Sequence, residues 1–359
     1  MAHRGVLSWL IGAIVPSLNG GALAGQRNVL LNGDGRVAQR GTTFTAATVP
    51  LNSDDTYLLD RWILLSDGND IVDVSQETTV VPTGAWSAFK FDIETANKKF
   101  GWFQPIERRN CAHLIGATAT WSFEARKGAS NATAGTLRAA LVSWQGTEDA
   151  VTSDLISAWN AAGANPTLAA NWTYETTPAD LVLTDSFQKF SATGAVDTAS
   201  SKNVGWLFWL DDADATVGDL IYTGNHQVEN GPIATVFEQR KYADEIASCQ
   251  YYAEWLGGDA DVYEVFGNGG ATSSTAAVIV SKYVRKRVRP TVTVTGSYVV
   301  LDGGGGVVTV TGISAGATNV GLTMVKLDIT VAAGLTAGQG APLFAENNTT
   351  SRIKIEAEM

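Results

Sequence analysis

The sequence predicts an all-β protein, in which a jelly-roll β-sandwich is followed by a second small β-sandwich and preceded by an apolar N-terminal attachment peptide. Three observations indicate this fold class. Glycine is abundant, at 37 residues, among many Thr, Val and Ala, which is the composition of short strands joined by tight turns. Candidate strands are separated by turn residues such as those of Asn32–Gly35. In the segment TWSFEARKG apolar and polar side chains alternate, so Trp121, Phe123 and Ala125 are expected on one face of a strand.

The chain has 359 residues, which is enough for two domains of roughly 150 residues each. Hydrophobic residues make up 45% of it and charged residues 17%, so sizeable cores are expected. The net charge of −11 argues against nucleic acid as a partner, because proteins that bind it need a basic face. Cys111 and Cys249 are too few for a disulfide framework and are expected to be reduced core residues.

Residues 1–27 differ from the rest of the chain and are interpreted as the attachment peptide. The apolar run from Val6 to Val15 is much shorter than the roughly 20 residues that span a bilayer, so no membrane insertion is expected. An apolar tail ahead of a compact domain favours insertion into a partner protein. Its contact residues are predicted to be Leu7, Trp9, Leu10, Ile11, Ile14 and Val15. A signal peptide, or a tail packed on its own domain, is the alternative.

Residues 28–230 are predicted to form the jelly-roll domain. Short segments rich in β-branched and aromatic residues, arranged around one core, indicate two packed sheets. The candidate strands are Asn28–Leu31, Asp60–Leu65, Ile71–Gln76, Ala88–Ile93, Ala117–Ala125, Leu137–Trp144, Phe187–Thr193, Val204–Leu210 and Leu220–Glu229. One helix is predicted at Asp154–Ala162, with Ser153 as its N-cap and Gly163 as its stop.

Residues 231–257 are predicted to form a linker with a short helix. Pro232 lacks the N–H that a strand ladder needs, so the preceding strand is expected to end there. From Tyr242 the apolar positions follow a helical period, with Ile246, Cys249 and Ala253 on the same face. A helix of two or three turns is marginal alone, so we expect it to dock on its neighbours.

Residues 258–359 are predicted to form the second β domain. Its candidate strands are Val278–Val284, Thr291–Thr295, Tyr298–Leu301, Val307–Thr311, Thr323–Val331 and Ser351–Ala357. The connections between them are rich in glycine, and large apolar residues are few, so the core should be thin. A thin core predicts burial of this domain against copies of the same chain.

The stretch around the linker resembles a segment common in bacteriophage tail-fibre and virion appendage proteins. In that family a β-sandwich ends in Q-x-E-x-G, followed by P-F-E-x-R, a short helix and C-Q-R-Y-Y. The matching residues are Gln227, Glu229, Gly231, Phe237, Glu238, Arg240, Tyr242, Glu245, Cys249, Gln250, Tyr251 and Tyr252. Two departures are Val236, where Pro is usual, and the absence of Arg between Gln250 and Tyr251. The segment NVLLNGDGRVAQRGTTF with Asp60-Arg61-Trp62, and the ending SRIKIEAEM, are also similar to the family.

The resemblance implies a sandwich like that of carbohydrate-binding modules for the first domain. It also implies a place in the virion, with assembly in the cytoplasm of a host bacterium. Other virion proteins, reached through the N-terminal segment, and further copies of the chain in a homotrimer are the implied partners. A glycan of the host surface is the additional partner that a carbohydrate-binding domain implies.

Three tryptophans are the candidates for glycan binding. Sugars present C–H faces that pack on indole rings, and the chain has 11 tryptophans. Trp102 lies in the segment GWFQP and Trp172 in NWTY, both interpreted as loops, and Trp86 precedes a cluster of aromatic residues interrupted by lysines. The alternative for each tryptophan is burial in the core.

Neither a metal ligand set nor a catalytic residue is predicted. The acidic residues Asp211, Asp212, Asp214 and Asp219, and the group Asp67, Asp70 and Asp73, leave a structural Ca²⁺ open, but solvated turns explain them equally well. The basic run Lys282, Arg285, Lys286, Arg287 and Arg289 is interpreted as a charged edge strand, which a subunit with acidic loops would also satisfy. The sequence has no nucleophile elbow, zinc-protease motif or P-loop, so an enzyme is not expected.

These observations predict a structural protein of a bacteriophage virion. It would be an oligomeric tail or head appendage that contributes to attachment to the host surface. A receptor-binding lectin and a capsid decoration protein are the alternatives. The apolar N-terminal tail favours the structural hypothesis, and Trp102 with its neighbours favours the lectin.

Overall fold

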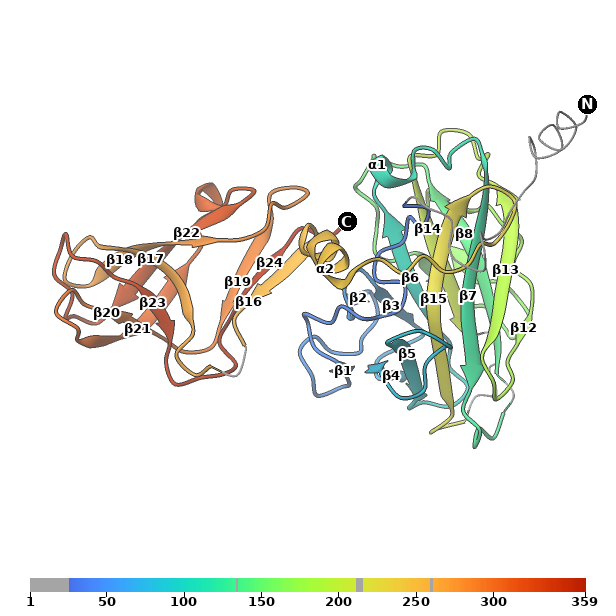
Figure 1. The fold of residues 1–359 in the computed structure, drawn as a ribbon, viewed down its shortest axis with the longest axis horizontal. Helices are drawn as coiled ribbons and strands as arrows, with labels where there is room; N and C mark the ends of the chain where they lie inside the picture. The colour runs from blue at the N-terminus through green and yellow to red at the C-terminus, as the bar shows by residue number, and fades with distance from the viewer. Residues whose placement is uncertain (1–25, 134, 211–215, 259–260) are drawn as a thin grey trace, which may run out of the picture. The chain divides into compact units, whose positions relative to one another are not determined.

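The computed structural model describes residues 26–133, 135–210, 216–258 and 261–359 (Figure 1). The chain divides into two compact units, of which the first runs to Tyr242 and includes Met359. The second unit comprises Ala243–Glu358. The boundary therefore falls inside the stretch expected to be a linker. None of the helices in the described ranges is long and apolar enough to cross a membrane.

The first unit is a sandwich of two antiparallel sheets (Figure 1). The first sheet has the order β1 (Thr43–Phe44), β4 (Val72–Glu77), β5 (Ala88–Ile93), β15 (Leu220–Asn230), β7 (Thr118–Lys127), β13 (Gln188–Ala195). The second has the order β11 (Trp172–Tyr174), β8 (Thr136–Trp144), β14 (Asn203–Leu210), β6 (Phe100–Ile106), β3 (Ile63–Ser66), β2 (Thr56–Tyr57), and β12 (Leu181–Val182) also pairs with β8. A four-residue helix, α1 (Arg108–Cys111), follows β6.

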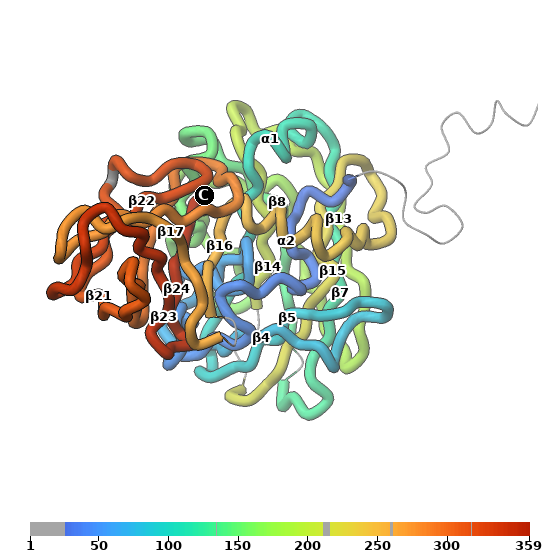
Figure 2. Tube along the Cα trace, turned by 60° about the vertical axis from the view of Figure 1, so that its left-hand side comes forward, coloured from blue at the N-terminus to red at the C-terminus, as the bar shows by residue number. Residues whose placement is uncertain are grey.

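The strand order confirms the predicted jelly-roll sandwich. From β5 onward each long strand crosses to the opposite sheet, in the sequence β5, β6, β7, β8, β13, β14, β15. Figure 2 shows the first sheet from another side, with β4, β5, β15, β7 and β13 in succession. The predicted alternation along β7 is also confirmed, because Trp121, Phe123 and Ala125 are buried in the core between the sheets.

One histidine lies at the centre of this core. His226 is completely buried, and its ring stacks on Phe123 and Phe208, with ring centroids 5.2 and 5.4 Å away. The indole Nε1 of Trp206 donates to His226 Nδ1 over 3.2 Å. Burial lowers the pKa of His226 to about 3, so this ring is neutral at physiological pH.

The second sheet is covered on both faces. Its outer face carries an apolar cluster that includes Phe103, Leu207 and Trp209, and residues 151–172 pack over it. All eight positions of β14 are buried for this reason. A strand covered on both sides needs a continuous apolar run, as in its sequence NVGWLFWL.

Two predicted elements of the first unit are wrong. The segment predicted as a helix at Asp154–Ala162 instead contains β9 (Ile156–Ala158), which pairs with β10 (Thr167–Leu168). Leu155 and Ile156 are neighbours that both enter the outer apolar cluster, and this packing outweighs the helix signals around them. Asn28–Leu31 is not a strand either. Val29 N donates to Val228 O, but the other hydrogen bonds to β15 are made by the Asn28 side chain, whose Nδ2 donates to His226 O and whose Oδ1 accepts from Val228 N.

The second unit is a barrel with a small sheet beside it. The barrel closes in the order β17 (Val265–Ala271), β18 (Ala276–Lys282), β22 (Met324–Val331), β21 (Val307–Ser314), β20 (Tyr298–Leu301), β23 (Leu343–Ala345). The sheet has the order β16 (Ala253–Leu256), β24 (Arg352–Glu356), β19 (Thr291–Thr295). The helix α2 (Tyr242–Gln250) precedes β16, as predicted, and a 3₁₀ turn, η1 (Ala317–Asn319), precedes β22.

The closed barrel differs from the second sandwich that the sequence predicts. All six predicted strands of this unit are present, but glycines in β17 let it curve and approach β18 closely. A Cβ at Gly269 would lie 1.7 Å from the carbonyl oxygen of Val278. Register shifts at Val265/Gly267 and at Val310/Gly312 add further curvature.

Candidate functional site

Trp102 is buried and has no face for a sugar, contrary to the prediction. It lies in β6 rather than in a loop, and its exposed fraction is 0%. Its ring stacks on Trp62 at 5.8 Å and meets Phe91 edge-on at 5.4 Å. The Gly and Pro of GWFQP indicated a loop, but both residues lie within the buried strand.

Trp172 is also a core residue, with an exposed fraction of 6%. It lies in β11, under the layer that covers the second sheet. Its ring meets Phe103 at 5.4 Å and Trp144 at 5.2 Å, and its Nε1 donates to Thr152 Oγ1 over 3.3 Å. The prediction of Trp172 as a glycan contact is therefore wrong for the same reason as that of Trp102.

Trp86 is different, because 59% of its surface is exposed. It lies in the connection between β4 and β5, just after a turn in which Ala85 N donates to Pro82 O over 3.0 Å. The predicted attachment residues Leu7, Trp9, Leu10, Ile11, Ile14 and Val15 lie outside the described residues.

A row of polar and aromatic side chains crosses the outer face of the first sheet. Tyr222 in β15 is paired with Lys90 in β5 on one side and with Arg126 in β7 on the other. Side chains paired in this way across neighbouring strands share one face of a sheet. Because their neighbours Phe91 and Ala125 are core residues, this row is on the outer face.

The guanidinium of Arg126 lies between two aromatic rings. Its Cζ is 5.7 Å from the centre of the Tyr222 ring and 5.9 Å from that of Phe187. Within the described residues its one hydrogen bond runs from Nε to the carbonyl of Lys127, over 3.0 Å. Sequence analysis did not single out these residues; the alternation along β7, which places Arg126 outward, was the available signal.

The connection that carries Trp86 lies against the same face. Pro82 is close to Gly224 in β15, where an added Cβ would be 3.1 Å from Pro82 Cγ. Beside it, Asn225 adopts a left-handed backbone conformation at the register shift of β15, and its Nδ2 donates to Glu124 Oε1 over 2.8 Å. Asn225 is 8% exposed, and its Oδ1 has no partner among the described residues. We call Lys90, Glu124, Arg126, Tyr222 and Asn225 the outer-face site.

The residues of the family-like motif meet in a buried polar network. Gln227 Nε2 donates to Glu229 Oε1 and to Thr235 Oγ1, over 2.8 and 3.0 Å. The hydroxyl of Thr235 donates in turn to Glu229 Oε2 over 2.8 Å, and Arg27 Nε lies 3.2 Å from the same carboxylate. Gln227, Glu229 and Thr235 are all buried, so their polar atoms are satisfied by one another.

The same network joins two distant parts of the chain. The carboxylate of Glu238 accepts hydrogen bonds from the backbone N–H groups of Arg27 and Asn28, over 2.6 and 2.8 Å. Arg240 donates to the carbonyls of Leu30 and Asn28. Residues 27–30 and 238–240 are therefore held together, and we call Gln227, Glu229, Thr235, Glu238 and Arg240 the polar clamp.

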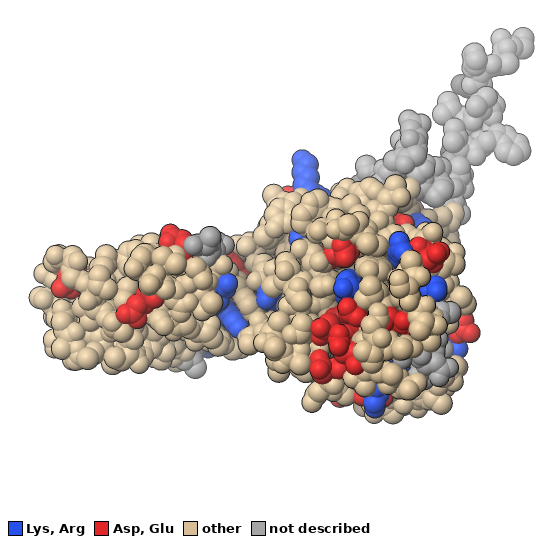
Figure 3. Space-filling view, turned by 90° about the horizontal axis from the view of Figure 1, so that it is seen from below, with Lys and Arg blue, Asp and Glu red and all other residues tan. Residues whose placement is uncertain are grey.

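Acidic side chains gather on the part of the first unit seen from below in Figure 3. Burial, and then repulsion from Glu94, Asp70 and Asp92, raises the pKa of Asp73 to about 6. Asn52 Nδ2 donates to both Asp70 and Asp73, each over 2.9 Å. Among the described residues no group of three or more His, Cys, Asp or Glu side chains is arranged to hold a metal ion.

The other acidic residues considered for Ca²⁺ are only partly described. Asp211, Asp212 and Asp214 lie outside the described residues. The carboxylate of Asp219 accepts hydrogen bonds from Ala132 N over 2.7 Å and from the Thr133 hydroxyl over 2.6 Å, so it fixes the neighbouring loop.

The basic run of the second unit contains a buried ion pair. The Lys286 side chain is 0% exposed, and its Nζ lies 2.8 Å from Glu254 Oε2. It also donates to the carbonyl of Gln250, and Val284 N donates to Glu254 Oε2 over 2.8 Å. Burial lowers the pKa of Lys286, while Glu254 opposes that shift. Lys286 thus has a structural role.

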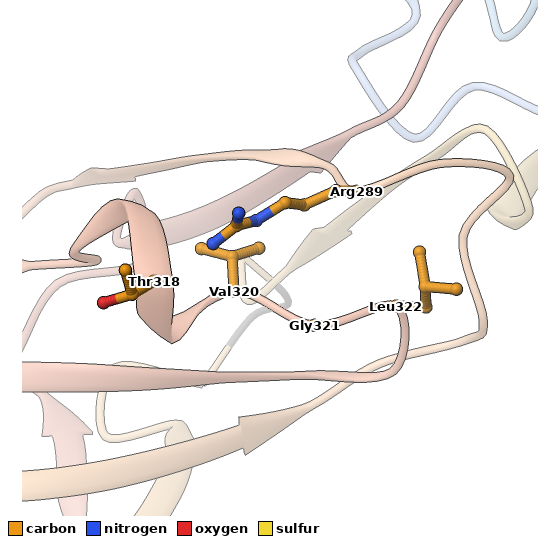
Figure 4. Close-up of a pocket in the computed structure, with 5 residues that line it drawn as sticks. All are labelled: Arg289, Thr318, Val320, Gly321 and Leu322. Atoms are coloured by element: carbon orange, nitrogen blue, oxygen red, sulfur yellow. The ribbon is translucent and has the colours of Figure 1, made fainter.

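A surface pocket of about 450 Å³ lies near the end of this run. It is lined by Arg289, Thr318, Val320, Gly321 and Leu322 (Figure 4). Figure 4 shows the guanidinium of Arg289 extended toward Val320 and Thr318. One exposed cation beside apolar side chains gives this pocket little means to select a ligand.

Comparisons with known proteins find similarity of fold. No protein-family model matches the sequence, and no curated protein matches it. Among solved structures, the enzymatically active domain of tailspike protein 4 of bacteriophage CBA120 is similar with a TM-score of 0.34 and 15% identity, over 60% of this chain and 24% of that one. The chain therefore spans about a quarter of that tailspike's length.

Carbohydrate-binding proteins are also among the similar structures. The CBM22-2 xylan-binding domain of Paenibacillus barcinonensis Xyn10C is matched with a TM-score of 0.29 and 11% identity, over 48% of this chain and 92% of that one. A structure titled "CBM4 structure and function" is matched with a TM-score of 0.30 and 14% identity, over 56% and 98%. These likenesses are partial ones of fold, and the β-sandwich of the first unit is established by its own strand order.

Proposed function

We propose that this chain is a structural protein of a bacteriophage virion, an oligomeric tail or head appendage that contributes to attachment to the host surface. In this proposal the first unit binds a surface glycan, and other virion proteins hold the chain through its N-terminal segment. A binding role rather than catalysis is proposed, because no catalytic motif occurs in the sequence.

The polar clamp supports the virion part of the proposal. The motif that resembles the phage family is not a scattered set of matches, because Gln227, Glu229, Glu238 and Arg240 act in one network. Glu238 N donates to Gln227 Oε1 over 2.8 Å and so connects its two halves. A motif whose members depend on one another is typical of a conserved structural device rather than a chance match.

The outer-face site supports the glycan part, and it is the observation on which that part depends. Sugar binding needs aromatic faces together with hydrogen-bond donors and acceptors for hydroxyl groups. The exposed Trp86 supplies a ring, and the half-buried Lys90 and Arg126 supply donors beside the buried Tyr222.

The test is binding of the purified protein to polysaccharide extracted from candidate host bacteria. Trp86→Ala should weaken binding by about fivefold to thirtyfold, since stacking on one exposed aromatic ring contributes of order 1–2 kcal/mol. The matched control is Tyr263→Ala, which removes an equally exposed ring in the second unit and should leave binding unchanged. Wild-type protein that binds no polysaccharide at all would overturn the glycan part, and the capsid decoration alternative would then be preferred.

A further inference from the structure

We propose that the outer-face site selects an acidic sugar, one whose ring carries a carboxylate, and that Arg126 is the residue that binds this carboxylate. The inference rests on the proposed glycan binding and specifies the ligand class of the same site.

The position of Arg126 favours a ligand with both a ring and a charge. Its guanidinium lies between Tyr222 and Phe187, which come from neighbouring segments on either side of β7. Packing against two rings restricts the guanidinium plane, so less conformational freedom is lost when it binds. The half-buried ring of Phe187 offers apolar surface for the C–H groups of a pyranose, and the buried ring of Tyr222 supports the guanidinium.

Arg126 forms no ion pair with a carboxylate of the described residues. Lys90 Nζ lies 3.3 Å from Asp92 Oδ2, so these two charges neutralise each other. Glu124 accepts the hydrogen bond of Asn225. Glu77 accepts two backbone hydrogen bonds from its own turn, those of Thr79 N and Val80 N.

The terminal nitrogens of Arg126 have no partner among the described residues. Because Nε is bonded to the Lys127 carbonyl, the free end of the guanidinium is the one formed by Nη1 and Nη2, and this end can form paired hydrogen bonds with a carboxylate. The half-buried carboxylate of Glu124 accepts hydrogen bonds and thus suits a hydroxyl group of the same sugar ring.

This ligand class has a further consequence for salt. The chain carries a net charge of −11, so an acidic polymer is repelled at long range and attracted only at the site. Long-range repulsion between exposed charges is screened by salt, whereas a partly buried contact is screened much less. Binding of an acidic polysaccharide should therefore weaken little between about 50 and 200 mM salt, unlike binding to a basic protein surface.

The experiment measures binding of D-glucuronate, D-galacturonate, D-glucose and inorganic phosphate to the full chain by isothermal titration calorimetry. The two uronates should bind at least about tenfold more tightly than glucose, because a charge-assisted pair adds to the contacts with the ring. Arg126→Gln should abolish that preference. Arg126→Lys keeps the charge but not the planar pair of N–H donors, and should retain only part of the preference. Lys127→Gln is the matched control, since it removes a cation from the next position of the same strand.

The outcomes separate this inference from the proposed function. Equal binding of the uronates and glucose would overturn the role of Arg126 and leave glycan binding standing. The same conclusion would follow if Arg126→Gln kept the wild-type melting temperature and the wild-type preference for uronates. Phosphate that binds as tightly as the uronates would show recognition of a simple anion and overturn the sugar. Loss of all binding in the wild type would contradict both proposals.

Discussion

Asp73 is a residue whose ionisation opposes folding at neutral pH. Its pKa is raised to about 6, first by burial and then by Glu94, Asp70 and Asp92. The folded protein therefore holds this proton more tightly than the unfolded chain does, and ionisation costs stability as pH rises from about 4 to about 6. Above that range the whole penalty is present.

Asp73→Asn should therefore raise the melting temperature at pH 8 and leave it nearly unchanged at pH 4. The new amide oxygen can still accept the hydrogen bond of Asn52, so no contact is lost. Thermal unfolding at the two pH values checks this, with Asp180→Asn as control, because Asp180 is paired with Arg138. A gain of equal size at both pH values would contradict the electrostatic explanation.

The apolar side chains can be read directly from the sequence, but which of them are buried in the fold cannot. Trp86, Trp102 and Trp172 are chemically alike, yet one is exposed and two are buried. Trp172 is buried because residues 151–172 form a third layer on a sheet face that is normally solvated. The pattern of a single strand carries no information about a distant segment that covers it. Arg126 was missed because its two rings come from other strands.

Among the elements, α2, β16 and the segment after β18 depend on one buried charge pair. Lys286 connects them through Gln250 and Glu254. Removing one partner of such a pair leaves the other buried without compensation, which is more damaging than never having had the pair.

Lys286→Met should therefore destabilise the second unit by about 3–5 kcal/mol. Adding Glu254→Gln should recover much of this loss, because it removes the uncompensated charge and keeps an acceptor for Val284 N. Chemical denaturation of both variants measures the effect. Arg285→Met, an exposed neighbour, should stay within about 0.5 kcal/mol of the wild type. Equal stability of the single and double variants would contradict the importance of the charge.

Elements were predicted well where local pattern and packing agree. Six strands of the second unit and α2 were predicted, and the structure contains them, whereas β16, β17 and β23 were not predicted. The helix at Asp154–Ala162 was predicted from a cap and a stop, but tertiary packing of Leu155 and Ile156 decided otherwise. The closure of the barrel depends on backbone approach at Gly269, which a count of glycines does not locate.

For the whole molecule, the composition of the barrel bears on assembly. Strands β17, β20, β21 and β23 carry no charged side chain, whereas roughly a quarter to a third of a soluble surface is usually charged. Depletion of charge is typical of surfaces that become buried between subunits. This supports the proposal that copies of the chain associate through the barrel as a homotrimer.

Sedimentation velocity should therefore find a trimer at micromolar concentration. Val307→Lys introduces a charge at an exposed position of β21 and should dissociate it. Val182→Lys places the same charge at an equally exposed position of the first unit and should leave the trimer intact. A wild-type monomer, or equal dissociation by both variants, would contradict assembly through the barrel.

The polar clamp also determines how the protein would carry mechanical load. Residues 27–30 and 238–240 are bonded to each other, so the jelly roll between them forms a closed loop of chain with a single point of attachment. If a particle pulled on the N-terminal segment while the second unit was held, the tension would pass through Glu238 and Arg240. The strands of the sandwich would stay unloaded until that junction failed. If the proposed function holds, the outer-face site would keep its shape while the chain is stretched.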